Sequence, residues 1–522
     1  MSKERKAVRK PLSFSTTMRN PERIAGFLNC VLPFEGQILT NKIIHEVIIK
    51  LISEKLYFTQ KYEMKIPEYK EIYKNPDLSF SREQVEDIIE NSPQEHKEAG
   101  FDKGWPSRFD TWYEFPQELG FIRYEMNKPI KISQTGHMLI DAFNETQPNN
   151  DKIQAVFLNA LIKYQTNNPF KKNLNANNPL ILTLKTLKGL KDLNANNAGL
   201  HRQELSLIIC WPDNNHQEVI NKVLDLRKKF GFSVSNEIIY DECMKLLEAG
   251  KDKENLYKMS KITDEAVDEF IRKMRITGIF SLRGNGRFLD FNNYEEETIN
   301  YVLSNYSSFN SFENKDEYFN YISDIDSKII ETIKSSTMDR LETKEQALIK
   351  WSKIFTKEDV EKELTLLMKN SKSNNEVLRV IDAPTRLEFL TSISIKQNFE
   401  NIRVVPNYKI DDEGLPTFTA SGGMADIECY DIDCKPIVEV TLMTAKTQAV
   451  NEIPAITRHL LERQEKYLTD KIFALFIAPN IHADAKYMID FSKYRDNVDI
   501  VPYTILEYIN KISTCTTIGQ ML

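Results

Sequence analysis

The chain has 522 residues, of which 41% are apolar and 28% are charged, a balance that indicates a soluble globular protein of two to four domains. The net charge of −7 excludes a uniformly basic nucleic-acid binder, and the apolar runs are too short to predict a membrane span. The amino terminus lacks the apolar stretch of a signal peptide, and the six cysteines form no CxxC pair, which favours free thiols in a reducing cytoplasm.

The amino terminus is strongly basic. The first 25 residues hold seven Lys or Arg side chains against two Glu: Lys3, Arg5, Lys6, Arg9, Lys10, Arg19 and Arg23. Such an arm can bind phosphates while the rest of the protein stays acidic, although a solvated terminal tail is the alternative.

Two segments in the first 300 residues share a pattern of helix, strand, turn and strand. After helices predicted over 41–56 and 82–90, the first copy places short strands near 118–124 and 130–139. In the second copy, Gly284-Asn285-Gly286 joins two apolar runs, a strong hairpin signal. The pattern predicts two winged-helix-like subdomains, about 1–150 and 151–300, which bind DNA or serve as protein-interaction modules.

The rest of the chain divides into a helical linker, 301–375, and an α/β domain, 376–522. The run 471–478 is apolar throughout and predicts a strand buried on both faces of a mixed sheet. The other predicted elements of this domain are a helix around 377–400, a strand 402–410, a hairpin 424–443, helices 451–468 and 482–494, a strand 498–503 and a last helix from about Ile505.

The hairpin carries the most informative pair of residues. A tight turn at Asp431–Cys434 pairs residue 431 with 434, and the same register brings Asp426 opposite Glu439. Directly opposed side chains have Cβ atoms roughly 4.5–5.5 Å apart, and two carboxylates that close repel each other unless a cation or proton lies between them. Because Glu439 interrupts an apolar strand, its charge indicates a functional pair, and we expect a divalent, oxygen-preferring metal such as Mg²⁺.

Two more acidic residues are candidates to join this pair. Glu388 lies in a helix before the sheet, and Glu452 begins the helix that follows the hairpin, where it shares one face with His459 and Arg463. An exposed helical Glu is usually a solvated charge, so neither residue is informative alone. The other residues with candidate or alternative roles are Lys446, Arg458 and His459 for transition-state or phosphate contacts, Glu428 as a less favoured ligand, and Asp431 and Asp433 as turn residues.

With these residues in view, the chain resembles the AlwI-type family of type IIS restriction endonucleases and their nicking relatives. The resemblance rests on the opening segment Lys10–Ile24, on the hairpin with Asp426 and Glu439-Val440-Thr441, and on Glu452–Leu460 followed by Leu475–Pro479. These segments occur in the family's order and span nearly the whole chain.

The resemblance implies a multidomain α+β protein: a winged-helix-like DNA-recognition region, a helical linker and a restriction-endonuclease-like, PD-(D/E)xK, nuclease domain. It implies Mg²⁺-dependent cleavage of double-stranded DNA at a fixed distance from a short asymmetric site, in a bacterial cytoplasm. Asp426 and Glu439 would be metal ligands, with Glu388 and Glu452 completing the acidic cluster. The wider fold usually has Lys at the position of Thr441, whereas the nicking members also have Thr there. The candidates to replace the lysine are Glu452, Lys446 or a second metal-bound water.

Arginine pairs bidentately with guanine edges, so Arg19, Arg23 and Arg108 are the candidates for base recognition, and Lys10 is a further candidate for DNA contact. We expect a monomer that dimerises transiently through the nuclease domain on DNA. The alternatives are a strand-specific nickase or the large subunit of a heterodimeric endonuclease, and, in another class, a winged-helix regulator without catalysis.

Overall fold

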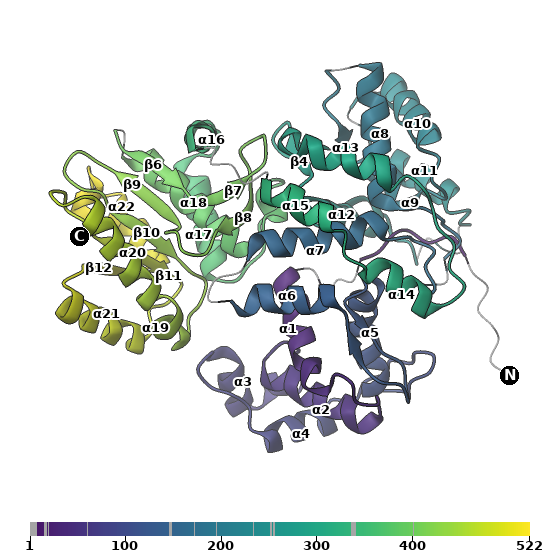
Figure 1. Cartoon of the computed structure of the whole chain (residues 1–522), viewed down its shortest axis with the longest axis horizontal. Helices are drawn as coiled ribbons and strands as arrows, with labels where there is room; N and C mark the ends of the chain where they lie inside the picture. Colours follow the sequence, from purple (N-terminus) through teal and green to yellow (C-terminus); the bar gives the residue numbers. More distant parts are fainter. Residues whose placement is uncertain are drawn as a thin grey trace. The chain divides into compact units, whose positions relative to one another are not determined.

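The computed structural model divides the chain into two compact units (Figure 1). The first comprises Met1–Lys70, Phe80–Phe143 and Asp151–Thr337, and the second comprises Glu71–Ser79, Asn144–Asn150 and Met338–Leu522. No helix in the described part of the chain is both long and apolar enough to cross a membrane. The structure describes residues 8–14, 18, 20–59, 61–145, 149–171, 173–194, 196–232, 234–250, 253, 256–335, 341–399 and 401–522.

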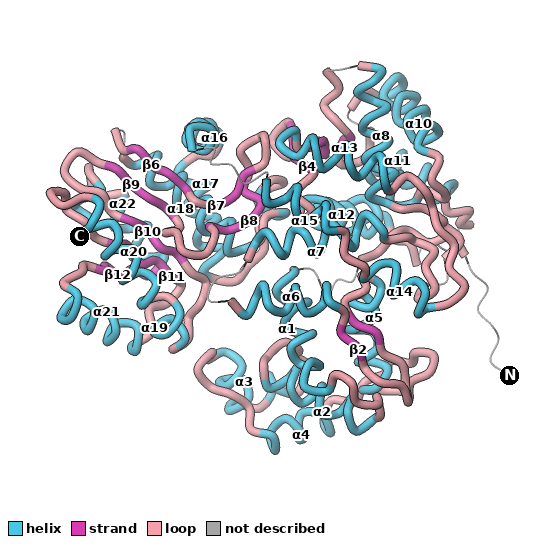
Figure 2. The backbone as a smooth tube through the Cα atoms, viewed as in Figure 1, coloured by secondary structure: helices cyan, strands magenta, loops and turns pink. Residues whose placement is uncertain are grey.

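The first unit is mostly helical, with two small sheets (Figure 2). Its strands form the antiparallel pair β1 (Ile122–Arg123) and β2 (Lys131–Ile132), and the order β3 (Leu200–His201), β5 (Phe288–Phe291), β4 (Phe280–Arg283). Its helices are α1 (Pro21–Val31), α2 (Asn41–Ser53), α3 (Pro67–Lys74, which ends in the second unit), α4 (Arg82–Asn91), α5 (Trp105–Glu118), α6 (Gln134–Asn144, whose last residue is in the second unit), α7 (Asn150–Lys163, whose first residue is in the second unit), α8 (Pro179–Leu193), α9 (Leu205–Cys210), α10 (His216–Phe230), α11 (Asn236–Leu246), α12 (Ala266–Arg275), α13 (Glu296–Asn305), α14 (Lys315–Ser323) and α15 (Ser327–Ser335).

Helix α5 forms although Gly104–Tyr113 contains few helix-forming residues. Pro106 lies in the first turn, where its missing N–H breaks no helical hydrogen bond. Trp112 and Tyr113 are fully buried, and Tyr113 donates its hydroxyl hydrogen to the main-chain oxygen of Phe27 at 2.7 Å. Burial of these aromatic side chains outweighs their low helix propensity.

Both predicted hairpins occur, in shorter form. The strands predicted near 118–124 and 130–139 reduce to β1 and β2, and the chain then enters α6. The second hairpin, β4–β5, follows α12 as predicted, and β3 adds a third strand to it. Their designation as winged helices remains a prediction.

The second unit is built on a five-stranded mixed sheet of order β12-β11-β10-β9-β6. Its strands are β6 (Arg403–Pro406), β9 (Ile427–Tyr430), β10 (Ile437–Val440), β11 (Ala474–Ala478) and β12 (Ile500–Thr504), with β7 (Tyr408–Ile410) and β8 (Pro416–Ala420) as a separate pair. Its helices are α16 (Leu341–Ile354), α17 (Lys357–Met368), α18 (Ala383–Asn398), α19 (Thr447–Asn451), α20 (Ile453–Lys466), α21 (Ala483–Asp496) and α22 (Ile505–Ile512).

The second unit has the mixed sheet that the sequence predicted. Strands β10, β11 and β12 are parallel, whereas β9 is antiparallel to both β10 and β6. All five residues of β11 are buried, as its apolar sequence predicted. Helices α20 and α21 pack their apolar sides, including Ile456 and Ile489, into one core cluster with Phe476 of β11. Figure 1 shows β6, β9 and β10 beside one another, and α18 packs against β6.

The predicted linker, 301–375, consists of helices α13 to α17, and the division between the two units falls within it. Two short stretches from the amino-terminal third belong to the second unit, which the sequence did not suggest. Asp77 of the first stretch accepts hydrogen bonds from the Lys446 main-chain N–H at 2.5 Å and from His482 Nε2 at 2.7 Å. In the second stretch, Asn150 Nδ2 donates to the Thr419 oxygen at 2.8 Å.

Candidate functional site

The β9–β10 hairpin has the register that the sequence predicted. Val438 pairs with Ile427, so the next pair along the ladder is Glu439 with Asp426, which immediately precedes β9. The two acidic residues are also linked by hydrogen bonds. Val440 N–H donates to Asp426 Oδ2 at 2.8 Å, and Asp426 N–H donates weakly to Glu439 Oε2 at 3.4 Å. Main-chain groups therefore hold both carboxyl groups at the same end of the hairpin.

Glu439 is supported from helix α20. His459 Nδ1 lies 2.8 Å from Glu439 Oε1, and both side chains are buried. Burial lowers the pKa of His459, which favours a neutral ring that donates from Nδ1. This placement favours support of Glu439 over the direct phosphate contact that the sequence suggested for His459.

Glu388 and Glu452 both approach the pair. Ala420 N–H donates to Glu388 Oε2 at 2.9 Å. Burial and then the charge of Asp426 raise the pKa of Glu388 well above its usual value, and burial and then the charge of Glu439 do the same for Asp426. Burial is also the main cause that raises the pKa of Glu439 to about 8, with a further contribution from the charge of Glu452. The structure thus brings together the four acidic residues that the sequence singled out.

Thr441 occupies the position where a lysine was expected. Burial raises the pKa of Glu452, and a hydrogen bond with the Thr441 side chain opposes that rise. Thr441 therefore contacts one of the four acidic side chains but brings no positive charge to them.

The sequence-predicted cations differ in their placement. Arg458 is exposed on α20, and its positive charge acts to lower the pKa of Glu439. Lys446 is exposed, and its main-chain N–H contacts Asp77. Arg463 donates to Glu428 at 2.7 Å; although burial alone would raise the pKa of Glu428, hydrogen bonds from Tyr430 and Arg463 lower it. Glu428 is therefore engaged in an ion pair beside the cluster.

Asn407 is a buried residue of the site that the sequence did not indicate. It follows β6, and its Nδ2 donates to the Ala425 oxygen at 2.6 Å while its N–H donates to the Asp426 oxygen at 2.9 Å. The Lys344 ammonium, from the first turn of α16, donates to the Asn407 oxygen at 3.5 Å. Both residues are far from the hairpin in sequence and lie in no motif, so only the fold identifies them.

The acidic pair fits a hard divalent cation. Within the described ranges, no three His, Cys, Asp or Glu side chains form a group that could hold a metal ion by themselves. Mg²⁺ is commonly held by one or two carboxylates, with water and substrate phosphate supplying the other oxygens. Asp426 and Glu439 would supply the carboxylates; burial is the main cause that raises the pKa of both, and the charge of a neighbouring acidic residue adds to the rise.

The candidate DNA contacts lie in the first unit. Lys10 is exposed, and its N–H donates to Asn175 Oδ1 at 3.0 Å. Arg23 contacts the Leu56 oxygen and lies over the Phe27 ring. Arg108 lies over Tyr57 and Trp112, with Nη1 2.7 Å from His96 Nε2. Arg19 lies outside the described residues. The internal contacts of Arg23 and Arg108 give them a structural role, so Lys10 is the most accessible of the described candidates.

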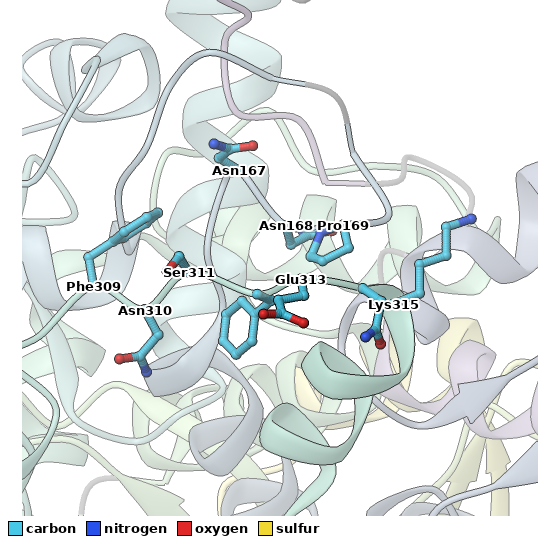
Figure 3. A pocket seen from close by; sticks show the side chains of 10 residues that line it. Asn167, Asn168, Pro169, Phe309, Asn310, Ser311, Glu313 and Lys315 are labelled. Atoms are coloured by element: carbon cyan, nitrogen blue, oxygen red, sulfur yellow. The ribbon is translucent and has the colours of Figure 1, made fainter.

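A cavity of about 510 Å³ lies elsewhere in the first unit (Figure 3). It lies between the loop that carries Asn167, Asn168 and Pro169 and the segment Phe309–Lys315, whose Phe309, Asn310, Glu313 and Lys315 side chains are labelled in Figure 3. None of its lining residues belongs to the acidic cluster, so this cavity is separate from the candidate site.

Solved structures that match this chain include three of restriction endonucleases. A solved structure of the small subunit of the heterodimeric restriction endonuclease R.BspD6I is 24% identical and covers 30% of this chain and 76% of its own, with a TM-score of 0.25. The match to the structure of restriction endonuclease FokI covers 99% of this chain and 98% of FokI, with 13% identity and a TM-score of 0.24. The match to the structure of FokI bound to DNA covers 98% of this chain and 97% of that chain, with 14% identity and a TM-score of 0.22. No curated protein sequence matches.

The family comparison extends over most of the chain. A model described as AlwI restriction endonuclease matches residues 117–363 and 342–510, a range that includes Glu388 and the β9–β10 hairpin. The sequence resemblance and the family model agree, and the chain belongs to the AlwI restriction endonuclease family.

Proposed function

We propose that this restriction endonuclease is of type IIS and uses Mg²⁺ to hydrolyse a DNA phosphodiester bond at a fixed distance from a short asymmetric recognition site. The observation that supports it most directly is the register that sets Asp426 beside Glu439, with Glu388 and Glu452 close enough to alter the cluster's pKa values. Four acidic side chains in one place repel one another unless a cation or protons lie between them, and this supports a cation site.

The proposed chemistry assigns separate tasks to the residues of the chain. Asp426 and Glu439 would hold the ion, with Val440 N–H and His459 Nδ1 fixing their orientation. Bound Mg²⁺ would lower the pKa of a water ligand and stabilise negative charge on the phosphoryl group. Glu452 hydrogen-bonds with Thr441, and its raised pKa suits a group that accepts a proton from the attacking water. Exposed Arg458 would balance charge on the DNA phosphate.

The test of this proposal is Asp426→Asn, which keeps the side-chain size and removes one charge. We expect it to bind DNA as the wild type does and to cleave plasmid in Mg²⁺ about 100-fold more slowly or worse. The matched control is Asp433→Asn, an exposed acidic residue in the turn of the same hairpin, which should cleave normally. Wild-type protein that binds DNA but cleaves none in Mg²⁺ would favour the winged-helix regulator instead, and a fully active Asp426→Asn would remove Asp426 from the site.

We also propose that each chain cuts one strand, so that double-strand cleavage needs a second copy of the chain. Helix α21 supplies a face for it: Tyr487, Phe491 and Tyr494, at helical spacing, are 71%, 41% and 89% exposed. Asp484 and Arg495 lie near opposite ends of the helix, so an antiparallel second copy brings opposite charges together.

The size of this face indicates a weak dimer. At about 150–250 Å² per aromatic side chain, the exposed parts of the three rings amount to roughly 300–500 Å² per chain, below the approximately 800 Å² per partner of a stable complex. We therefore expect a monomer in solution and a dimer on DNA. Supercoiled plasmid that becomes open circles but never linear DNA, even at high enzyme concentration, would favour the nickase alternative.

DNA recognition is proposed to lie in the first unit, with Lys10 as a phosphate contact and Arg19, Arg23 and Arg108 as the candidates to read bases. Lys10→Ala should weaken binding about equally for all sequences and reduce the salt dependence of binding by about one phosphate contact. If Arg108→Ala lowers stability without relaxing sequence preference, its stacking between Tyr57 and Trp112 is its only role.

A further inference from the structure

A second cation besides exposed Arg458 acts on the acidic cluster, and it is partly buried. Lys344 lies in the first turn of α16, which packs against α18, the helix of Glu388, and against β6. Its ammonium donates to the Asn407 main-chain oxygen at 3.5 Å, the outer limit of a hydrogen bond. The contact itself is weak, so the importance of Lys344 depends on where it places a charge.

Asn407 connects Lys344 to Asp426. The residue is buried, and it holds the chain before β9 at two points, through its side chain to Ala425 and through its main chain to Asp426. By contacting the Asn407 oxygen, the Lys344 ammonium therefore helps to hold the segment that fixes the position of the Asp426 carboxyl group.

The same cation acts on Glu388. Burial and the charge of Asp426 raise the pKa of Glu388, and the positive charge of Lys344 opposes that rise. Exposed Arg458 acts on Glu439 from α20. Because Lys344 is partly buried, solvent and salt screen its charge less than that of Arg458.

We propose that Lys344 is a positioning residue of the nuclease site, whose ammonium balances the charge of Glu388 and steadies the Asn407–Asp426 segment. The inference rests on the proposed hydrolysis of DNA. It assigns to helix α16, 82 residues before Asp426 in sequence, the positive charge that Thr441 does not supply.

Three variants test this role. Lys344→Met removes the charge and keeps the length of the side chain, and Lys344→Arg keeps the charge. The matched control is Lys350→Ala, on the same helix, because Lys350 is exposed and pairs with Glu413 at 2.8 Å, away from the cluster. Single-turnover cleavage of a duplex that contains the site mapped with wild-type enzyme is measured across a Mg²⁺ titration, with DNA affinity and thermal stability measured in parallel.

We expect Lys344→Met to slow single-turnover cleavage about 10- to 100-fold at saturating Mg²⁺, the range found when groups that orient metal ligands are removed. Its half-saturating Mg²⁺ concentration should not rise, because the cluster becomes more negative. Lys344→Arg should recover most of the rate, and Lys350→Ala should match the wild type.

Two outcomes overturn the role of Lys344. In one, Lys344→Met cleaves within about threefold of the wild type. In the other, it loses rate, Mg²⁺ affinity and thermal stability together and Lys344→Arg does not recover them, which marks a structural residue. The proposed function is judged separately: it fails if wild-type protein does not cleave in Mg²⁺ or if Asp426→Asn remains active, whereas a normal Lys344→Met with an inactive Asp426→Asn refutes this inference alone.

Discussion

Replacing Glu439 by glutamine should make the metal-free protein more stable while it destroys catalysis. The pKa of Glu439 rises from 4.5 to about 8 in the folded protein, chiefly because the side chain is buried. Each pKa unit corresponds to about 1.4 kcal/mol, so the ionised folded state is disfavoured by up to about 5 kcal/mol. Glutamine has the same size, can keep the contact with His459 and carries no charge.

The gain in stability has a defined pH dependence. Folded Glu439 holds its proton more tightly than the unfolded chain does, so wild-type stability from this group is fully present below pH 4.5 and is lost as the pH rises towards about 8. The Glu439→Gln protein does not lose this stability as the pH rises, because glutamine does not ionise. Its free energy of unfolding relative to the wild type should therefore rise between these pH values by about 2–5 kcal/mol.

The measurement must report the second unit alone, because a chain of two units need not unfold in one step. Hydrogen exchange of the β11 segment, followed by mass spectrometry across a urea series with EDTA, provides this. Glu465→Gln, exposed on α20, is the control and should change nothing. A Glu439→Gln protein that is no more stable than the wild type at pH 8, or whose gain is the same at pH 5 and pH 8, would refute the reasoning.

Three further predictions concern other parts of the molecule. Asp110→Asn should raise the free energy of unfolding of the first unit at pH 8 by up to about 3 kcal/mol and leave it unchanged below pH 4, because burial raises the pKa of Asp110 to about 6. Hydrogen exchange of the α5 segment across a urea series at both pH values checks this. Phe476→Ala should destabilise the second unit by about 3–5 kcal/mol, since the ring is fully buried in the core of β11, and exchange of the neighbouring strands should accelerate. Tyr487→Ser with Tyr494→Ser should leave nicking of supercoiled plasmid intact but reduce linear product at low enzyme concentration; unchanged linear product at every concentration would exclude the α21 face as the contact between copies.

The hairpin was predictable because its information is local. Turn residues at Asp431 and Cys434 set the register, and the structure keeps it: Asp431 N–H donates to the Cys434 oxygen at 2.9 Å. A side-chain period of two then fixes which residues face each other. Strand β11 was also predictable from local sequence, because an uninterrupted apolar run of this length indicates a strand buried on both faces.

The parts of the site that the sequence did not reveal depend on distant contacts. Lys344 and Asn407 look like ordinary polar residues along the chain, and only the fold brings Lys344 to Asn407 and Asn407 to Asp426. Helix α5 was missed for the opposite reason: local propensity argued against a helix, and burial of Trp112 and Tyr113 prevailed.

The second unit consists of three separate stretches of the chain, and this limits how such enzymes can be re-engineered. A fragment that begins at Met338 would lack Glu71–Ser79 and Asn144–Asn150, and with them the partners of His482, of the Lys446 N–H and of the Thr419 oxygen. Transplanting the second unit onto another DNA-binding protein as a single continuous fragment would thus leave His482, the Lys446 N–H and the Thr419 oxygen of β8 without these partners. A successful chimera would have to carry the two borrowed stretches with it, or replace the contacts of Asp77 with new ones.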